Sequence, residues 1–180
     1  TSVCKLRGVC TGGTCSEETD FPDGSECDDN NENEDSESYI KCIGTNVYFY
    51  SDVSKKTILF LLERMQDAMN NIGTNVPPSE RAIYLYIHSD GGEAYAGISA
   101  MTHLKTYPCK VVTICDGFLA SAATLVFLGG HERRMTKHSH MLIHQLSTSF
   151  DGRYAELRDE YKNSTLLMDT MKSIYSTETS

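Results

Sequence analysis

The stretch AIYLYIHSDGGEAYAGISAMTHLKT, residues 82–106, decides the fold of this chain. Its first six residues form a continuous apolar run, typical of a strand that is buried on both faces. The next five, HSDGG, have the composition of a tight turn. Apolar residues then recur at helical spacing as far as Leu104. The stretch therefore predicts a strand, a turn and a helix, the repeating part of a βαβ fold.

The same alternation extends in both directions. Residues 46–50 are rich in aromatic and β-branched side chains, as strands are, and residues 51–73 carry apolar side chains at helical spacing. Residues 109–115 indicate a second buried strand, 116–130 a turn followed by a helix, and 140–146 a further short strand. This order predicts an α/β fold with a mainly parallel sheet and right-handed crossovers. Functional residues are then expected at the carboxyl ends of the strands.

The first 40 residues differ in composition from the rest. Residues 1–40 hold 11 Asp or Glu against Lys5 and Arg7, whereas residues 41–180 hold 14 residues of each sign. Residues 16–38 combine high charge with almost no apolar content, which is the composition of disordered segments. We therefore expect a disordered, acidic, cysteine-bearing tail over 1–40 and one folded domain over 41–180.

Charge and motif content exclude several classes of protein. The neutral domain lacks the basic footprint of a nucleic-acid-binding protein, and the acidic tail would repel phosphate and anionic lipid headgroups. The apolar run 117–130 is shorter than the roughly 18 residues that a membrane span needs. Phosphate-loop and dinucleotide fingerprints are missing, and His138 and His140 have no further ligands at metal spacing. The expectation is a cytoplasmic protein without a cofactor or a metal, which binds neither nucleic acid nor membrane.

Three features fall at the ends of predicted strands. The turn at Gly91 and Gly92 is either a tight turn alone or a source of exposed N–H groups for an oxyanion. His144 is either an ordinary strand-end histidine or a general base. Ser121, among alanines, is either a small packing residue or a nucleophile beside the free N–H groups of a helix start. Because all three fall at neighbouring strand ends, their conjunction favours a catalytic site.

The segments IYLYIHSDGGEAYAGISAM, VVTICDGFLASAATLVFLGG and HMLIHQL together resemble the Clp serine peptidases, the proteolytic subunits of ATP-dependent Clp proteases, within the Clp/crotonase superfamily. The resemblance covers about residues 45–180. It implies a Clp/crotonase-like fold that ends in a long handle helix, and hydrolysis of unfolded polypeptides through an acyl-enzyme. The site residues that it implies are Ser121 as nucleophile, His144 as general base, backbone N–H groups of Gly91, Gly92 and Ala122 as oxyanion hole, and Leu146 as part of a peptide-pairing strand.

The sequence departs from the family pattern at several positions. Asp90 and Leu146 stand where the family usually has proline, and leucine keeps an N–H that proline lacks. The third triad member of the family is an aspartate that lies well beyond the helix after His144. Asp169 falls within that helix, and the sequence ends near the end of the helix at Ser180. The peptidase domain is thus expected to lack its C-terminal part, and a triad without its carboxylate loses most of its rate.

The predicted last helix carries a regular seam. Its members recur at alternating spacings of three and four, and they are Tyr154, Leu157, Tyr161, Ser164, Met168, Met171 and Tyr175. Such a seam packs either on its own domain or on a partner helix, and the second is favoured. The resemblance implies a homo-oligomer of stacked rings that encloses the active sites, with an ATP-dependent unfoldase as partner.

Two other functions remain open at this stage. A weakly active or inactive ring subunit, structural or regulatory, would keep the fold and the helix seam. A crotonase-like acyl-CoA enzyme would use the same oxyanion hole for a thioester enolate, but that chemistry does not need the pair of Ser121 and His144.

Overall fold

The computed structural model describes residues 10–11, 14–15 and 39–179. The chain divides into two compact units, residues 1–35 and residues 36–180. In the first unit, β1 (Cys10–Thr11) pairs antiparallel with β2 (Thr14–Cys15). The tail expected over 1–40 lies mostly outside the described residues.

The second unit is an α/β fold built on a six-stranded sheet. Its strands are β3 (Ile40–Ile43), β4 (Asn46–Phe49), β5 (Ala82–Ser89), β6 (Lys110–Ala120), β7 (Glu132–Met135) and β8 (His140–Leu142). Its helices are α2 (Lys55–Asn71), the short 3-10 helix η1 (Pro78–Glu80), α3 (Ala94–Lys105), α4 (Ala122–Leu128) and α5 (Tyr154–Glu178). The strands are ordered β3-β4-β5-β6-β7, with β8 paired to the end of β6. Every pairing except β3 with β4 is parallel, which confirms the predicted fold class.

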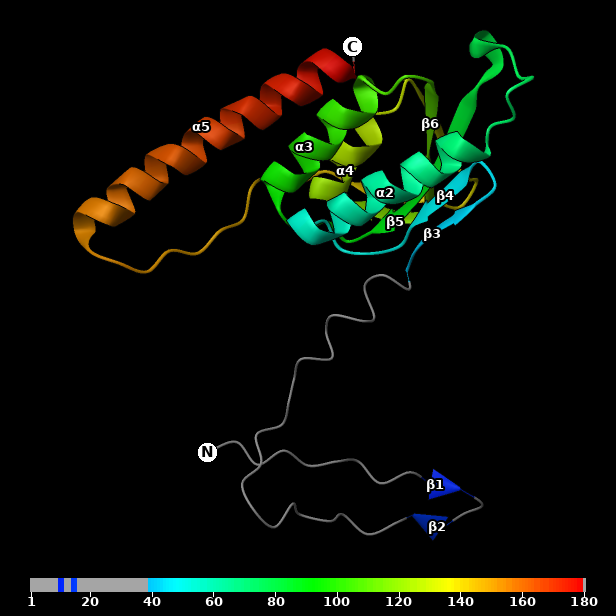
Figure 1. Ribbon diagram of the computed structural model, residues 1–180. Helices are drawn as coiled ribbons and strands as arrows, with labels where there is room; N and C mark the ends of the chain where they lie inside the picture. The colour runs from blue at the N-terminus through cyan, green and yellow to red at the C-terminus, as the bar shows by residue number, and fades with distance from the viewer. Residues whose placement is uncertain (1–9, 12–13, 16–38, 180) are drawn as a thin grey trace. The chain divides into compact units, whose positions relative to one another are not determined.

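Helices α2, α3 and α4 pack together against the sheet (Figure 1). Alternate residues of β4 and β5 point into this core because successive side chains of a strand face opposite sides of the sheet. The fully buried members include Val47, Phe49, Ile83, Leu85, Ile87, Leu61, Met65 and Leu104. At the start of α2, the Ser54 hydroxyl accepts from Thr57 N–H at 3.2 Å and fixes where the helix begins. The core thus holds β5 and β6 rigidly at the centre of the sheet.

A bulge in β6 re-aims the strand before it reaches Ser121. The register of β5 against β6 shifts between Ile87 and Ser89, so that residues 116–118 lie opposite His88 alone. Gly117 has φ +90°, and a Cβ there would lie 2.7 Å from His88 Nδ1. Because a bulge bends its strand and increases its twist, this one directs the end of β6 toward α4.

Two boundaries differ from those predicted. Strand β6 continues to Ala120, and the turn expected from residue 116 is the bulge within this strand. Apolar and small residues continue from Phe118 through the end of the strand into the helix, so periodicity does not mark the boundary at Ser121. Strand β8 ends at Leu142, so the strand expected over 140–146 is too long.

Two strands of the six-stranded sheet were not predicted. Strand β7 has the sequence ERRM, whose charged side chains are exposed or half-buried, so it lacks the alternation of a half-buried strand. Strand β3 directly follows the acidic segment and pairs antiparallel with β4 through the turn at Gly44, which has φ +63°. Both lie in the outer part of the sheet, where packing imposes the weakest sequence pattern.

Helix α5 extends away from the rest of the second unit, and its C-terminal end lies close to α3 and α4 (Figure 1). Among its residues, Met171 is buried, whereas Tyr154 and Tyr161 are 81% and 72% exposed. The N-terminal half of the predicted seam is therefore not packed on its own domain. Within the part of the chain that the structure describes, no helix combines the length and the apolarity needed to cross a bilayer.

Candidate active site

Ser121 occupies a sharp junction between β6 and α4. It is the N-cap of α4, with φ 52° and ψ −127°, and among the described residues it is the one non-glycine residue with positive φ. A residue held in such a region stores about 1–3 kcal/mol of strain, and strain of this kind clusters at active sites. A strained serine at a strand-to-helix turn is the arrangement that presents a nucleophile at the edge of an α/β sheet.

The glycine turn after β5 packs directly against this junction. Gly91 has φ +107°, and a Cβ there would lie 2.6 Å from Ser121 Cβ and 3.1 Å from Ala122 N. The Gly91 carbonyl accepts from Val53 N–H at 2.7 Å, which ties the turn to the segment before α2. Only glycine fits here, so the turn predicted at the end of β5 and the serine predicted at the end of β6 are brought together.

The three candidate oxyanion donors are not equivalent. The N–H of Gly91 donates to Ser89 Oγ at 3.2 Å and is already engaged. Ala122 is the first residue of α4, where an N–H has no acceptor within the helix. Neither Ala122 nor Gly92 donates its N–H to another residue in the described part of the chain. The donors available to a ligand are therefore those of Gly92 and Ala122.

His144 lies at the same edge of the sheet as Ser121. Strand β8 runs parallel to the end of β6, with Leu142 paired to Ala120, and the Leu142 carbonyl accepts from Ser121 N–H at 3.0 Å. His144 follows two residues later, exposed, in an irregular segment rather than in the predicted strand. Its Nδ1 lies 2.7 Å from the Gln145 carbonyl oxygen, and no hydrogen bond joins it to Ser121 across residues 39–179. Backbone pairing thus brings the two residues to one edge, while the imidazole is turned aside.

No carboxylate hydrogen bonds to His144 within residues 39–179. Asp169 lies on α5, as the sequence predicted, and forms an exposed ion pair with Lys172 at 3.4 Å. Leu146 is half-buried and lies in the same irregular segment as His144, not in a strand. The structure therefore packs the serine against the glycine turn and places His144 two residues beyond the strand that pairs with the end of β6, with no acid hydrogen bonded to the histidine within residues 39–179.

The model of the Clp protease family matches residues 44–180 of this chain, which is most of the second unit and contains all of these groups. This chain belongs to the Clp protease family. Membership supports a peptidase role for this chain.

Curated relatives agree with this assignment. The chain is 28% identical over 141 residues to a protein of Chlorella vulgaris, a match that covers 74% of this chain and 70% of that protein. It is 30% identical over 139 residues to a protein of Huperzia lucidula, covering 72% and 66% of the two chains. Both are named ATP-dependent Clp protease proteolytic subunit. The chain spans about two thirds of the length of such relatives.

A solved structure shows the same fold. A mutant ClpP1 of Listeria monocytogenes superimposes with a TM-score of 0.60 at 18% identity, covering 72% of this chain and 68% of that one. This likeness confirms the Clp-like arrangement of the sheet and helices.

A polar cluster that the sequence did not predict holds the bulge beside the site. The Tyr50 hydroxyl donates to the Asp116 carboxylate, and His88 Nδ1 lies 2.9 Å from the Asp116 carbonyl oxygen. Burial, followed by the hydrogen bond to Asp116, raises the pKa of Tyr50 well above its ordinary value, so this phenol remains a donor. The Asp-Gly pair at 116–117 was the available signal, but it indicated a turn rather than a bulge.

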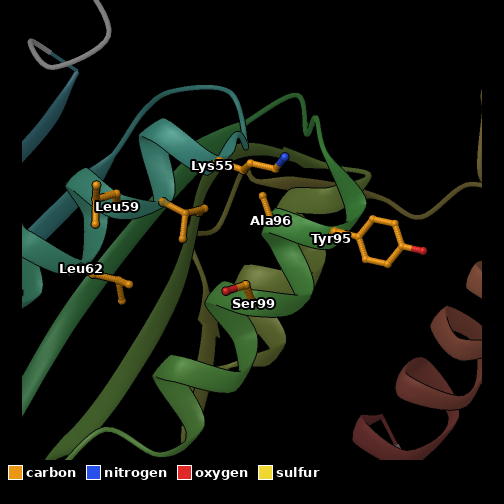
Figure 2. A pocket seen from close by; sticks show the side chains of 7 residues that line it. Lys55, Leu59, Leu62, Tyr95, Ala96 and Ser99 are labelled. Atoms are coloured by element: carbon orange, nitrogen blue, oxygen red, sulfur yellow. The ribbon is translucent and has the colours of Figure 1, made fainter.

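An apolar groove lies between α2 and α3. Figure 2 shows Leu59 and Leu62 of α2 on one side and Ala96 and Ser99 of α3 on the other, with Lys55 near the helix starts. Its lining contains no pair of acid and base groups, so it is not a candidate for bond cleavage. Leu62 belongs to the apolar residues at helical spacing in this segment, whereas Leu59 lies outside that pattern and is 58% exposed. Across the described part of the chain, no three His, Cys, Asp or Glu side chains gather as a metal-binding group.

Proposed function

We propose that this protein is a serine endopeptidase that cleaves unfolded polypeptides through an acyl-enzyme. The observation that carries the proposal is the strained backbone of Ser121 at the junction of β6 and α4, with Gly91 packed against it. If the residue served only to fill space, alanine or glycine would do so at no greater cost in free energy. Packing alone therefore does not explain a serine held at a positive φ. Membership of the Clp protease family supports the same reaction class.

The mechanism follows from the placement of the groups. An extended peptide lies beside the glycine turn and pairs with the segment around Leu146. His144 takes the proton from Ser121 Oγ as this oxygen attacks the scissile carbonyl carbon, and the N–H groups of Gly92 and Ala122 hold the resulting oxyanion. The proton then passes to the leaving amine as the C–N bond breaks. Water, deprotonated by His144, releases the acyl group and restores Ser121.

The contact between His144 and Gln145 bears on the first step. A proton on Nδ1, donated to the Gln145 carbonyl, leaves the lone pair of Nε2 free to act as the base. Rotation of the ring toward Ser121 is then required, as is common for catalytic hydrogen bonds that tighten when substrate binds. A backbone carbonyl stabilises the charged imidazolium less than a carboxylate would, so we expect a low turnover rate.

Assembly into stacked rings is part of this proposal. Tyr154, Tyr161 and Leu166 of α5 expose apolar surface along one helix, which a second copy of the chain would cover. A closed chamber would admit extended polypeptide and exclude folded proteins, and an ATP-dependent unfoldase would supply the substrate. The chain itself carries no nucleotide-binding motif.

Replacement of His144 by alanine tests the role of the base. General base catalysis contributes about 10²–10⁴-fold, so kcat for a small fluorogenic peptide is expected to fall by about that factor in His144→Ala. The matched control is His103→Ala, which changes an exposed histidine of α3. Equal rates for His144→Ala and the control would remove His144 from the mechanism.

Assembly is tested at Tyr161, which is 72% exposed on α5. Tyr161→Asp places a charge in the proposed contact between helices, so sedimentation analysis is expected to show a loss of oligomer. Tyr161→Phe keeps the aromatic side chain and is expected to leave the oligomer intact. If Tyr161→Asp sediments as the unchanged protein does, α5 is not the contact.

A second candidate function is an inactive ring subunit, structural or regulatory. It is favoured by one observation, that His144 has no carboxylate partner across residues 39–179. Such a subunit would assemble through α5 in the same way but would not react with a serine-directed phosphonate. The two candidates therefore differ in the reactivity of Ser121.

A further inference from the structure

The last turns of α5 are fastened to the body of the second unit. The Glu178 carboxylate pairs with Lys105 at the end of α3, and its carbonyl accepts from the Arg133 guanidinium at 3.0 Å. Met171 is buried, and Tyr175 lies one turn beyond it. The end of α5 close to α3 and α4 in Figure 1 is thus a docked end. The contact that it makes through Tyr175 leads directly to the nucleophile.

Thr124 connects Tyr175 to Ser121. The Thr124 Oγ1 lies 2.5 Å from the Ser121 carbonyl oxygen and 2.5 Å from the Tyr175 hydroxyl oxygen. A carbonyl oxygen only accepts, and a threonine hydroxyl has a single proton, so Thr124 donates to Ser121. Tyr175 must then donate to Thr124. The direction of both hydrogen bonds is fixed: from Tyr175 to Thr124, and from Thr124 to the Ser121 carbonyl.

These bonds act on the strained residue itself. The Ser121 carbonyl also accepts from Thr124 N–H at 3.0 Å, and the Ser121 N–H donates to Leu142. Both backbone polar groups of Ser121 are therefore held while its φ is 52°. A strained conformation persists only where its surroundings over-determine it, and that backbone sets the direction of the Cα–Cβ bond that carries Oγ. Loss of one restraint would let the junction relax.

We propose that Tyr175 is a positioning residue, which holds the Ser121 backbone in its strained conformation through Thr124 and thereby aims the nucleophile from the docked end of α5. The proposal rests on the proposed role of Ser121. Helix α5 would then help to set the geometry of the active site in the same chain, in addition to its proposed role in assembly. Tyr175 touches neither substrate nor the reacting atoms.

The environment of Tyr175 suits a permanent donor. Burial raises the pKa of the Tyr175 phenol above its ordinary value. The phenol therefore keeps its proton throughout the neutral range. Thr124 is itself buried, at 1% exposure, so an unpaired hydroxyl there would not be compensated by solvent.

The test compares wild type with four single variants, Tyr175→Phe, Thr124→Val, Thr124→Ser and Tyr107→Phe, and with one double variant. The readouts are the rate of Ser121 labelling by a fluorophosphonate, and kcat and KM for a small peptide. We call the two hydrogen bonds from Tyr175 to Thr124 and from Thr124 to Ser121 the relay. Loss of one of them in Tyr175→Phe is expected to lower the rate of labelling and kcat about tenfold, while KM stays within about twofold of the wild-type value. Thr124→Val is expected to be at least as slow, and Thr124→Ser, which keeps the hydroxyl, to restore the rate.

Tyr107→Phe is the matched control, because it removes the hydroxyl of another half-buried tyrosine, one packed against the core. It is expected to label as wild type does. The double variant Tyr175→Phe with Thr124→Val is expected to be no slower than Thr124→Val alone, since both break the same relay. Two results would overturn the inference while leaving Ser121 as nucleophile. One is a wild-type rate of labelling in Tyr175→Phe, and the other is a loss in the double variant that combines the full losses of both single variants. Failure of wild type to label at Ser121 would overturn the proposed function and this inference together.

Discussion

Replacing Ser121 by alanine is expected to abolish peptide cleavage while leaving the fold and the assembly unchanged. Alanine offers no atom that can attack a carbonyl carbon, and loss of the serine from a complete catalytic triad costs on the order of 10⁶ in kcat. The loss here is expected to be smaller, because His144 lacks a carboxylate partner within residues 39–179 and the starting rate is lower. A small residual rate, up to about 10³–10⁴-fold above that of the peptide in buffer, would come from binding and the oxyanion donors, which remain. The measurement is steady-state hydrolysis of a short fluorogenic peptide.

The control for this variant is Ser99→Ala, which removes an exposed hydroxyl of α3. It should keep the rate of the unchanged protein. Sedimentation and thermal melting of Ser121→Ala should match those of wild type, because alanine fills nearly the same volume. A Ser121→Ala protein that still cleaves the peptide at the wild-type rate contradicts the assignment.

Gly91→Ala is expected to lose nearly all activity and much of its stability. The new Cβ would lie 2.6 Å from Ser121 Cβ and 2.8 Å from the Ala120 carbonyl oxygen, so either the turn or the junction must move. The backbone at φ +107° adds strain of about 1–3 kcal/mol for any residue with a side chain. A displacement of about 1 Å at a reacting group can cost about 10²-fold in rate. Peptide hydrolysis and thermal melting measure the two effects.

Gly44→Ala separates strain from crowding. Gly44 also has a positive φ, +63°, but a Cβ there would meet nothing within 4 Å. Its cost is limited to about 1–2 kcal/mol for the left-handed backbone, and the rate of hydrolysis should not change. If Gly91→Ala and Gly44→Ala had the same activity, the packing of the glycine turn on Ser121 would have no catalytic importance.

The fold was predictable because its signals are local and repeated. The continuous apolar runs of β5 and β6 follow from burial on both faces of the sheet. The helical spacing of apolar residues in α2 and α3 follows from burial of one face of each helix. The glycine turn was predictable for a similar reason, since adjacent glycines mark a backbone that few other residues can adopt. The positions of Ser121 and His144 at the sheet edge then followed from the strand order.

Other features depend on individual hydrogen bonds and close contacts rather than on a repeated pattern. The sequence does not reveal that Ser121 has a positive φ, because that strain comes from Gly91, Thr124 and Leu142 acting together. Nor does it reveal that Ser89 Oγ engages the Gly91 N–H, which leaves Gly92 and Ala122 as the free donors. The bonds to Ser89 and Thr124 are local and the bond to Leu142 joins two separate elements, but the periodicity of apolar residues encodes none of them.

The relay from Tyr175 through Thr124 to Ser121 is another feature that the sequence pattern does not reveal. Tyr175 was predicted as one member of an apolar seam, and its spacing gives no sign that its hydroxyl would reach α4. Its neighbour in the seam, Met171, is buried on the same domain, while Tyr154 and Tyr161 remain exposed. The seam therefore divides into a docked end and an unpartnered end, and the two ends have different proposed roles.

The central claim, that Ser121 is the nucleophile, is tested most directly by mapping the site of covalent modification. The full chain is treated with a fluorophosphonate, digested, and analysed by mass spectrometry. The structure predicts one phosphonyl adduct, on Ser121, that is absent from Ser121→Ala and forms more slowly in His144→Ala. An adduct on a different residue, or no adduct on a folded and assembled protein, would contradict the claim.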